Sequence, residues 1–541
     1  MHLLASTPGA LDDGARPVDP RQTPADLVVL SAADTELALL SAAREGMADA
    51  PSLRLWSLRD LAHPVSVDLH LEACAVRSRM VVARVLGGAG YWRHGLAATS
   101  AALFAAGVPF VALPGDDRPD EELRALSTVG DADYAGLWAF LVEGGLPNAE
   151  GFLRHARAML DGGERPAPAR PLLRAGAWWP GEGEAGLNAV RAHWAPGAPV
   201  VPVVFYRALV QAGSTQPVAQ LVKALLRRGM NPLPVFVASL KEEVSRATLA
   251  HLLAEAPPAV ILNLTSFATG TPDAPGLNPL AGDHGAPVIQ AVLAGSTEAA
   301  WAEGTRGLSA TDVAMNVALP EVDGRILSRA VSFKDEARFD EATECPIVTH
   351  VPRQDRVAFV ADLAAGWARL RATAPAERRV ALVLANYPDR DGRMANGVGL
   401  DTPASVVACL RLMAGAGYAV EDVPADARAL MDRLMAGPTN HLADRATREG
   451  GEAFPVAAYR RWFDALPWEV KSSVTGRWGA PEADPFVEGD AFRLGVHRLG
   501  GVVLGLQPAR GYGIDPKATY HDPALVPPHH YLAFYLWLRE A

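Results

Sequence analysis

The sequence predicts a multidomain α/β fold with doubly wound parallel or mixed sheets flanked by helices. Short, largely apolar runs, such as 26–30, 80–86 and 202–206, have the composition of strands buried on both faces. Segments with helical spacing of apolar residues separate these runs, and this alternation is typical of parallel sheets. At ~150 residues per domain, the length of 541 residues corresponds to about three to four domains.

The first predicted domain covers residues 1–150. Its expected strands are 26–30, 53–56, 80–86 and 109–113, and its first helix is expected at 36–47. Residues 151–200 contain DGGERPAPARP and WWPGEGE, which are rich in proline, glycine and charge. We expect this segment to be a connector.

The second predicted domain covers residues 201–375 and again alternates strands with helices. Its expected strands are 202–206, 232–238, 259–265, 287–293 and 313–319, with helices at 215–228 and near 241–255. A third α/β block, 376–541, follows. Its expected elements are strands at 378–386, 418–423 and 501–508 and helices at 403–416, 429–437 and 529–540. The last helix ends the chain without a polar tail, so we expect this block to be truncated.

Composition excludes several classes of protein. The chain has 50 basic and 61 acidic residues and a formal net charge of −11, whereas sequence-independent nucleic-acid binding needs a net basic face. The three cysteines lie far apart and form neither a CxxC pair nor a disulfide framework, so we expect a reducing, cytoplasmic location. The first residues lack the basic region of a secretory signal.

One stretch, 96–113, carries no charged residue and approaches the length of a membrane span. Gly107 and Pro109 interrupt it. Its two halves have the patterns of a helix and a buried strand, so we expect no membrane-spanning helix.

The first polar loop, LANYPDRDGRMANGVGLDTPAS, follows the strand expected at 378–386. Open α/β sheets bind their ligands at the carboxyl ends of strands, which is where this loop begins. Its candidate ligand-binding side chains are Asp389, Arg390, Asp391 and Arg393. Thr402 before Pro403 predicts the N-cap of a helix whose first N–H groups would face an anion. A solvated loop that pairs its own charges is the alternative.

The second polar loop, LQPARGYGIDPKATYHDPALVPPHHY, concentrates imidazole, carboxylate and phenol groups. These are Tyr520, His521, Asp522, His529 and His530. Imidazole binds borderline divalent metals such as Co²⁺ and accepts a proton near neutral pH. The spacing matches no structural zinc pattern and HExxH is absent, which favours a transient metal contact or a proton acceptor. A hydrogen-bonded structural histidine is an equally good alternative.

Two familiar catalytic motifs are missing from the sequence. No GxxxxGK[ST] motif is present, so any ATP-driven step would belong to another subunit. No GxSxG motif is present, which leaves covalent hydrolase chemistry unsupported. The stretch GGAGYWRHG (87–95) could form a ligand-binding turn, although a plain tight turn before a helix is the simpler interpretation.

Several of these motifs resemble the large subunits of aerobic cobaltochelatases, the CobN family, which is similar to the large subunits of magnesium chelatases. The resemblance is carried by LGGAGYWRHG, PVVFYRALVQAGSTQPVAQLVKALLRRGMNPLPVFVASLK, YPDRDGRMANGVGLDTPASVV and QPARGYGIDPKATYHDPALVPPHHYLAFYLWLRE. Within the last of these, DPKATYHDPALVPP favours the cobalt branch. The chain is similar to the N-terminal part of the family, and a later HxGxHGxxEWLPGK segment of the family is absent from it.

The resemblance implies an ATP-dependent metal chelatase that inserts Co²⁺, as a substrate, into hydrogenobyrinic acid a,c-diamide during aerobic cobalamin biosynthesis. ATP and Mg²⁺ would be used by the partner subunits CobS and CobT. By this interpretation His521 accepts a pyrrolic proton or transfers the metal, Asp522 orients it, and His529 is a second metal ligand. The expected substrate-binding residues are Asp389, Arg390, Asp391, Arg393, Arg510 and Tyr520.

Two alternatives stay open. The chain could belong to a magnesium chelatase that binds protoporphyrin, or it could be a non-catalytic scaffold module that binds a tetrapyrrole. Preference for a corrinoid over a porphyrin, and for Co²⁺ over Mg²⁺, separates the first alternative from the main interpretation.

Overall fold

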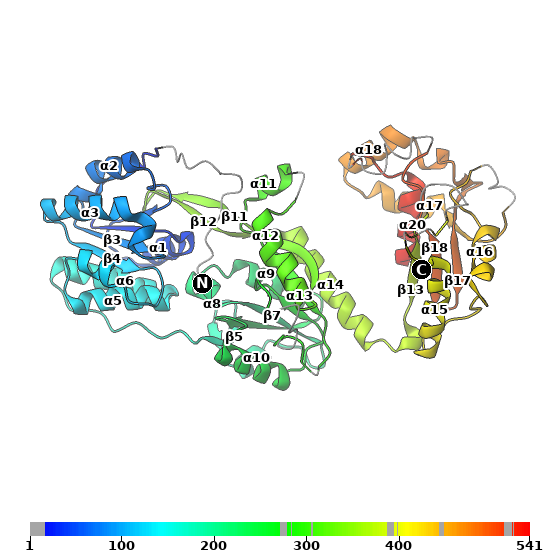
Figure 1. Ribbon diagram of the computed structural model, residues 1–541, viewed down its shortest axis with the longest axis horizontal. Coiled ribbons are helices and arrows are strands. Elements are labelled where there is room, and N and C mark those ends of the chain that lie inside the picture. Colours follow the sequence, from blue (N-terminus) through cyan, green and yellow to red (C-terminus); the bar gives the residue numbers. More distant parts are fainter. Residues whose placement is uncertain are drawn as a thin grey trace. The chain divides into compact units, whose positions relative to one another are not determined.

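The computed structural model describes residues 17–541 except for a few short segments. The segments left out are 271–277, 283, 305–306, 387–393, 396, 398, 443–447, 513–521, 523 and 541. The chain divides into two compact units, Met1–Arg369 (unit 1) and Leu370–Ala541 (unit 2). Both contain sheets flanked by helices, which confirms the predicted α/β class (Figure 1). Across the described residues, no helix is both long enough and apolar enough to cross a membrane.

Unit 1 begins with a four-stranded parallel sheet in the order β2-β1-β3-β4, here called the first sheet. Its strands are β1 (Leu27–Ser31), β2 (Leu53–Ser57), β3 (Met80–Val85) and β4 (Phe110–Pro114). Helices pack on both faces (Figure 1), so every residue of β1, β3 and β4 is buried. The helices are α1 (Asp34–Gly46), α2 (Pro64–Ala73), α3 (Arg93–Ala106), α4 (Glu121–Leu126), α5 (Asp131–Glu143) and α6 (Leu146–Asp161), with short 3₁₀ turns η1 (Ala75–Arg77) and η2 (Ala89–Trp92).

The second sheet of unit 1 has eight strands in the order β12-β11-β10-β9-β7-β8-β5-β6. They are β5 (Ala175–Trp179), β6 (Gly183–Ala185), β7 (Val200–Tyr206), β8 (Asn231–Val237), β9 (Ile261–Asn263), β10 (Val288–Leu293), β11 (Ile326–Asp340) and β12 (Cys345–Pro352). The central strands from β8 to β11 are parallel, and the outer strands are antiparallel. The helices are α7 (Leu187–Arg191), α8 (Arg207–Gln211), α9 (Gln216–Leu226), α10 (Glu243–Glu255), α11 (Glu298–Glu303), α12 (Ala310–Val313), the π-helix η3 (Ala314–Ala318), α13 (Leu319–Val322) and α14 (Gln354–Ala372).

Two expected strands differ from the structure. The strand expected at 313–319 is wrong, because 310–322 is helical and its start is capped by Ser309, whose Oγ accepts the N–H of Asp312 at 3.1 Å. A short apolar run does not by itself distinguish a strand from a helix. The strand expected at 418–423 is reduced to one bridge. Within 151–200, the structure has the end of α6, the strands β5 and β6 and the helix α7, and the longest stretches without a helix or strand are 162–174 and 192–199.

A long antiparallel hairpin, β11–β12, extends from the second sheet onto the first. Its register runs from Ser332 opposite Pro352 to Asp340 opposite Cys345. Cys345 and Ile347 are buried in the core that covers one face of the first sheet. One hairpin therefore belongs to the second sheet at its base and to the core of the first sheet at its tip.

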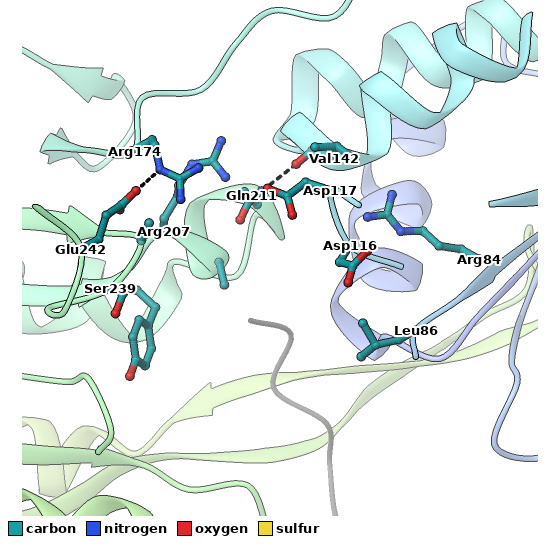
Figure 2. Close-up of a pocket in the computed structure, with 13 residues that line it drawn as sticks. Arg84, Leu86, Asp116, Asp117, Val142, Arg174, Arg207, Gln211, Ser239 and Glu242 are labelled. Carbon is teal, nitrogen blue, oxygen red and sulfur yellow. Dashed lines mark hydrogen bonds and ion pairs between the residues drawn. The ribbon is translucent and has the colours of Figure 1, made fainter. Parts of the chain in front are cut away.

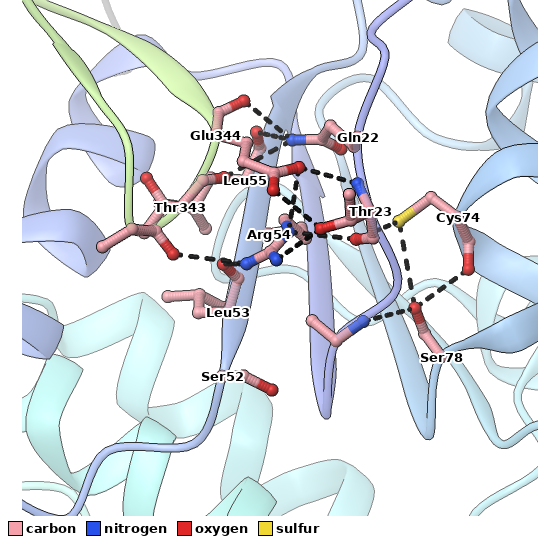
Figure 3. Close-up of polar contacts among 12 residues, drawn as sticks. Gln22, Thr23, Ser52, Leu53, Arg54, Leu55, Cys74, Ser78, Thr343 and Glu344 are labelled. Carbon is pink, nitrogen blue, oxygen red and sulfur yellow. Dashed lines mark hydrogen bonds and ion pairs between the residues drawn. The ribbon is translucent and has the colours of Figure 1, made fainter.

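Polar contacts fix the tip of this hairpin beside β2 (Figure 3). Gln22 Nε2 donates to the backbone oxygens of Leu55 at 2.9 Å and Glu344 at 3.0 Å. The Glu344 carboxylate accepts the backbone N–H and the hydroxyl of Thr23, both at 2.7 Å, and pairs with Arg54 Nε at 3.1 Å. Gln22 is buried, and the side chains of Arg54 and Glu344 are only 14% and 24% exposed, so the contacts hold the hairpin in one position on the sheet.

Unit 2 contains two three-stranded sheets, β13-β18-β17 and β14-β16-β15. The strands are β13 (Val380–Leu384), β14 (Glu452–Pro455), β15 (Val487–Glu488), β16 (Ala491–Leu494), β17 (Val496–Leu499) and β18 (Val502–Leu506). The helices are α15 (Thr402–Gly415), α16 (Ala427–Ala436), α17 (Val456–Asp464), α18 (Trp468–Trp478) and α20 (His529–Glu540), with 3₁₀ turns η4 (Pro375–Glu377) and η7 (Pro481–Ala483). The buried face of α20 packs in the core that also contains side chains of α17, β14 and β16. A Cβ at Gly505 would lie only 2.7 Å from Phe534, so β18 needs a glycine there.

We predict that Glu344→Ala destabilises unit 1 by about 2 kcal/mol, because the substitution removes two hydrogen bonds to a carboxylate and an ion pair with a largely buried arginine. Urea denaturation measures the change. Glu341→Ala, at an exposed position of the same hairpin turn, is the matched control and should change the free energy of unfolding by less than about 0.5 kcal/mol. Equal effects of the two substitutions would contradict the role of Glu344.

We predict that His70 makes unit 1 acid-sensitive between pH 6.5 and 4. Burial lowers the pKa of His70 from its ordinary value of 6.5 to about 4. In this range the unfolded chain binds a proton at His70 and the folded chain does not, so the free energy of unfolding falls as the pH decreases. His70→Gln should reduce this loss by about 3 kcal/mol over the whole window. The measurement is denaturant unfolding at several pH values, and parallel profiles for the two proteins would contradict the prediction.

Candidate functional site

Both polar loops of the sequence begin at the same edge of one sheet in unit 2. The first loop follows β13 and the second follows β18, and these two strands are parallel neighbours. Directly after β18, the backbone N–H of Gln507 donates to the oxygen of Leu384 at the end of β13, at 2.9 Å. The parallel pairing therefore brings the starts of the two loops together.

Asn440 joins the starts of the two loops. Its Nδ2 donates to the backbone oxygens of Gln507 at 3.0 Å and Asn386 at 3.4 Å, and its Oδ1 accepts the N–H of Ala509 at 3.2 Å. Its side chain is buried. Asn440 was not among the predicted site residues, because a single asparagine after a helix resembles any turn residue.

Asp484 holds the second loop at both of its ends. Its carboxylate accepts the hydroxyl of Tyr512 at 3.1 Å and the backbone N–H of His530 at 3.0 Å. It also accepts the N–H of Phe486 at 3.0 Å, and the residue is only 4% exposed. Tyr512 immediately precedes the segment 513–521, which lies outside the described residues. Asp484 lies in no motif that carries a mechanism, so it too was absent from the predicted site.

His529 is fully buried and both of its ring nitrogens have partners. Its Nε2 lies 3.0 Å from the oxygen of Gly479, which can only accept, so Nε2 carries the proton. Its Nδ1 then accepts the hydroxyl of Tyr459 at 2.8 Å. Burial lowers the pKa of His529, which favours the neutral ring. Metal binding by His529 would require one of these bonds to break, so its role as a metal ligand stays a prediction.

The neighbouring His530 is also part of the core. Its ring stacks on Phe486 with the ring centroids 4.0 Å apart and an angle of 11° between the planes. Its Nε2 donates to the backbone oxygen of Arg493 at 3.1 Å. These two histidines have the hydrogen-bonded structural environment that was the alternative for the second polar loop.

The first polar loop ends at a capped helix, one residue earlier than expected. Asp401 is the N-cap of α15, and its carboxylate accepts the N–H of Ala404 at 3.1 Å. The prediction of Thr402 as the cap is therefore wrong, since Thr402 is the first residue of the helix. Aspartate and threonine are both good caps, and the sequence DTP does not decide between them.

The structure describes only some of the other predicted site residues. Arg510 and Asp522 are exposed, and Asp522 Oδ1 accepts the N–H of Ala524 at 2.9 Å in a turn. The remaining predicted residues, Asp389, Arg390, Asp391, Arg393, Tyr520 and His521, lie outside the described residues. In the described part of the chain, no group of three or more His, Cys, Asp or Glu side chains is placed to hold a metal ion. The described residues thus supply a framework that fixes where the two loops begin and end.

The comparisons with known proteins identify the family. The family model described as CobN/Magnesium Chelatase matches residues 138–541. The chain is 50% identical to the aerobic cobaltochelatase subunit CobN of Sinorhizobium sp, over 100% of this chain and 43% of that protein. It is 42% identical to the protein of the same name in Pseudomonas aeruginosa, over the same shares. It is 27% identical to the magnesium-chelatase H protein of Rhodobacter capsulatus, over 44% of this chain and 20% of that protein.

A solved structure agrees with these sequence matches. The catalytic subunit of cobaltochelatase from Mycobacterium tuberculosis superimposes with a TM-score of 0.71 and 31% identity, over 95% of this chain and 41% of that chain. The chain thus spans less than half the length of these cobaltochelatase relatives. With a family model that covers most of its length and a half-identical relative aligned throughout, the chain belongs to the CobN/magnesium chelatase family.

Proposed function

We propose that the chain is part of the large subunit of an ATP-dependent cobaltochelatase and takes part in inserting Co²⁺ into hydrogenobyrinic acid a,c-diamide in aerobic cobalamin biosynthesis. One observation carries the proposal. The identity to the two CobN relatives extends over the whole chain, whereas the identity to the magnesium-chelatase H proteins is lower and covers part of it.

In this proposal the energy for insertion comes from partner subunits. The sequence has no GxxxxGK[ST] motif, so ATP and Mg²⁺ would be bound by CobS and CobT rather than by this chain. ATP hydrolysis in the partners would drive a closing or releasing movement of the large subunit.

The proposed chemical step is proton removal from the ring. Metal insertion requires the pyrrolic nitrogens to lose their protons as the ion loses its water. We assign His521 as the proton acceptor or as the group that delivers Co²⁺, and Asp522 as the carboxylate that orients it. The hydrogen bonds of Asp484 to Tyr512 and His530 support this assignment, because they fix described residues on either side of His521 in the sequence.

The proposed substrate contacts involve the periphery of the ring. Guanidinium groups bind carboxylates through two parallel hydrogen bonds, which suits Arg390, Arg393 and Arg510. Asp389, Asp391 and Tyr520 would accept hydrogen bonds from amide groups of the same substrate. The pairing of β13 with β18 supports a joint role, since it places the starts of both loops at one edge.

Two other functions would leave different signatures. A magnesium chelatase large subunit would prefer protoporphyrin to the corrinoid. A scaffold module would bind the tetrapyrrole, and substitutions in the second polar loop would not change the rate of metal insertion.

We predict that the purified chain binds hydrogenobyrinic acid a,c-diamide saturably and in preference to protoporphyrin. The measurement is a visible-absorbance titration with the corrinoid, with protoporphyrin as competitor, in the presence and absence of Co²⁺. Preference for protoporphyrin would favour the magnesium chelatase alternative. Failure to bind either ring would contradict a substrate site in this chain.

We predict that His521→Ala slows cobalt insertion by about 10²-fold or more, the range for loss of a general base. The assay follows the absorbance change of the corrinoid with a large subunit carrying the substitution, CobS, CobT, Mg²⁺ and ATP. His251→Ala is the matched control and should leave the rate unchanged, because His251 is exposed on α10 of unit 1 and lies in no candidate motif. An unchanged rate for His521→Ala would remove its proposed role, and unchanged corrinoid binding would confirm that the variant is folded.

A further inference from the structure

A cavity of about 580 Å³ lies in unit 1, between the first and second sheets. Residues at or just after the carboxyl ends of four parallel strands line it: β3 and β4 from the first sheet, and β7 and β8 from the second (Figure 2). Its volume is within the range typical of small-molecule sites. Carboxyl ends of parallel strands are also where open α/β sheets bind their ligands.

Hydrogen bonds across the cavity fix its walls relative to each other. Gln211 of α8 donates through Nε2 to the oxygen of Val142 at 2.8 Å, and its backbone oxygen accepts the N–H of Gly145 at 2.7 Å. Arg207 Nη2 pairs with Glu143 at 3.2 Å. Helix α8 is therefore joined to the end of α5 and the turn after it directly beside the cavity.

Arg84, at the end of β3, supplies a buried donor without a partner. The residue is 2% exposed, its Nη2 donates to the oxygen of Gly115 at 3.1 Å, and its Nε lies 2.8 Å from Glu36. Its Nη1 is buried and has no hydrogen-bond partner. In Figure 2 the guanidinium points toward Asp116 and Asp117. An unsatisfied buried charged donor is costly, so an acceptor is missing here.

Arg174 and Arg207 place two more guanidinium groups on the opposite wall (Figure 2). The Nε of Arg174 pairs with Glu242, and the Nε and Nη2 of Arg207 bond to Leu173 and Glu143. Burial lowers the pKa of Arg207; the charge of Glu143 opposes this shift, and the nearby charge of Arg174 adds to it. Two neighbouring like charges repel each other, and a bound anion would relieve that repulsion.

Asp116 and Asp117 lie between these two walls, after β4. Their carboxylates would repel a negative group placed beside them, so the negative groups of a ligand would lie at the arginines on the two walls. The two carboxylates would accept hydrogen bonds from hydroxyl or amide groups. The cavity thus combines donors at its two sides with acceptors between them.

From this arrangement we propose that the cavity binds an organic ligand with at least two carboxylate groups, one held by Arg84 and another by Arg174 and Arg207, with hydroxyl or amide groups facing Asp116 and Asp117. Two sources share this chemistry. One is a free hydroxy-polycarboxylate. The other is the periphery of an acid- and amide-bearing tetrapyrrole, and this source rests on the proposed function above.

The test is isothermal titration calorimetry of the chain at constant ionic strength with three probes: citrate, hydrogenobyrinic acid a,c-diamide and ATP. We expect saturable binding of citrate or of the corrinoid. If ATP binds at all, the arginine substitutions should not weaken its binding. Arg84→Gln and Arg174→Gln should each lower the affinity for the probe that binds by about tenfold or more. Arg84 is buried, so Arg84→Gln could unfold the chain. Arg174 has a side chain that is 56% exposed, and its substitution keeps the test valid.

Two further variants sharpen the result. Arg228→Gln is the matched control, because Arg228 pairs with Asp362 away from the cavity and its loss should leave binding unchanged. Glu242→Gln frees Arg174 from its partner and should tighten binding. Equal affinities of wild type, Arg174→Gln and Glu242→Gln would overturn the proposal, as would the absence of binding by both citrate and the corrinoid.

The arms of the experiment also separate this proposal from the proposed function. Corrinoid binding that Arg174→Gln weakens identifies the tetrapyrrole as the source. Citrate binding that Arg174→Gln weakens, with corrinoid binding unchanged or absent, identifies a free carboxylate. Corrinoid binding that no cavity substitution changes, together with no citrate binding, overturns the cavity proposal and leaves the proposed function in place.

Discussion

Parallel strand pairing is the constraint on which both candidate sites depend. Parallel neighbours end at the same edge of a sheet, so loops that are far apart in sequence begin side by side. In unit 2 this rule joins the loops after β13 and β18, and in unit 1 it gathers the ends of four strands around one cavity. Buried apolar side chains hold these strands in place, while the strand ends are left to carry polar groups.

Each site relies on buried polar groups for its position. Asn440 and Asp484 in unit 2 bond mainly to the backbone, and the groups that they bond flank the two loops. A buried side chain that satisfies several backbone groups fixes a loop more firmly than a surface contact, because breaking it leaves several polar atoms without partners. In unit 1 the corresponding groups of Arg84 are only partly satisfied. The described anchors in unit 2 thus have hydrogen-bond partners, whereas Arg84 in unit 1 retains a donor without one.

The α/β class and most strands could be predicted from the sequence, because largely apolar runs such as 80–86 and 202–206 need burial on both faces. The helix at 310–322 could not, since its apolar run suits either structure and a single serine cap decides. The position of the β11–β12 hairpin tip could not be predicted either, because it depends on partners such as Gln22 that are distant in sequence.

The candidate functional site could also be predicted only in part from the sequence. Polar loops at strand ends are visible in a sequence, so the two loops of unit 2 could be located. Their anchors could not, because Asn440 and Asp484 acquire their roles only when distant segments fold together. The environment of His529 follows the same logic, since Tyr459 and Gly479 lie far from it in the chain.

The docking of the hairpin tip also has a consequence for synthesis on the ribosome. Gln22 and its acceptor at Glu344 are separated by 322 positions, so the first sheet emerges long before the strand that completes its core. Until β12 has left the exit tunnel, the apolar surface that later covers Cys345 and Ile347 stays open to water. The domain around the first sheet therefore stays incomplete during most of the translation of unit 1. During this period the exposed apolar surface of its core is one that a chaperone could bind.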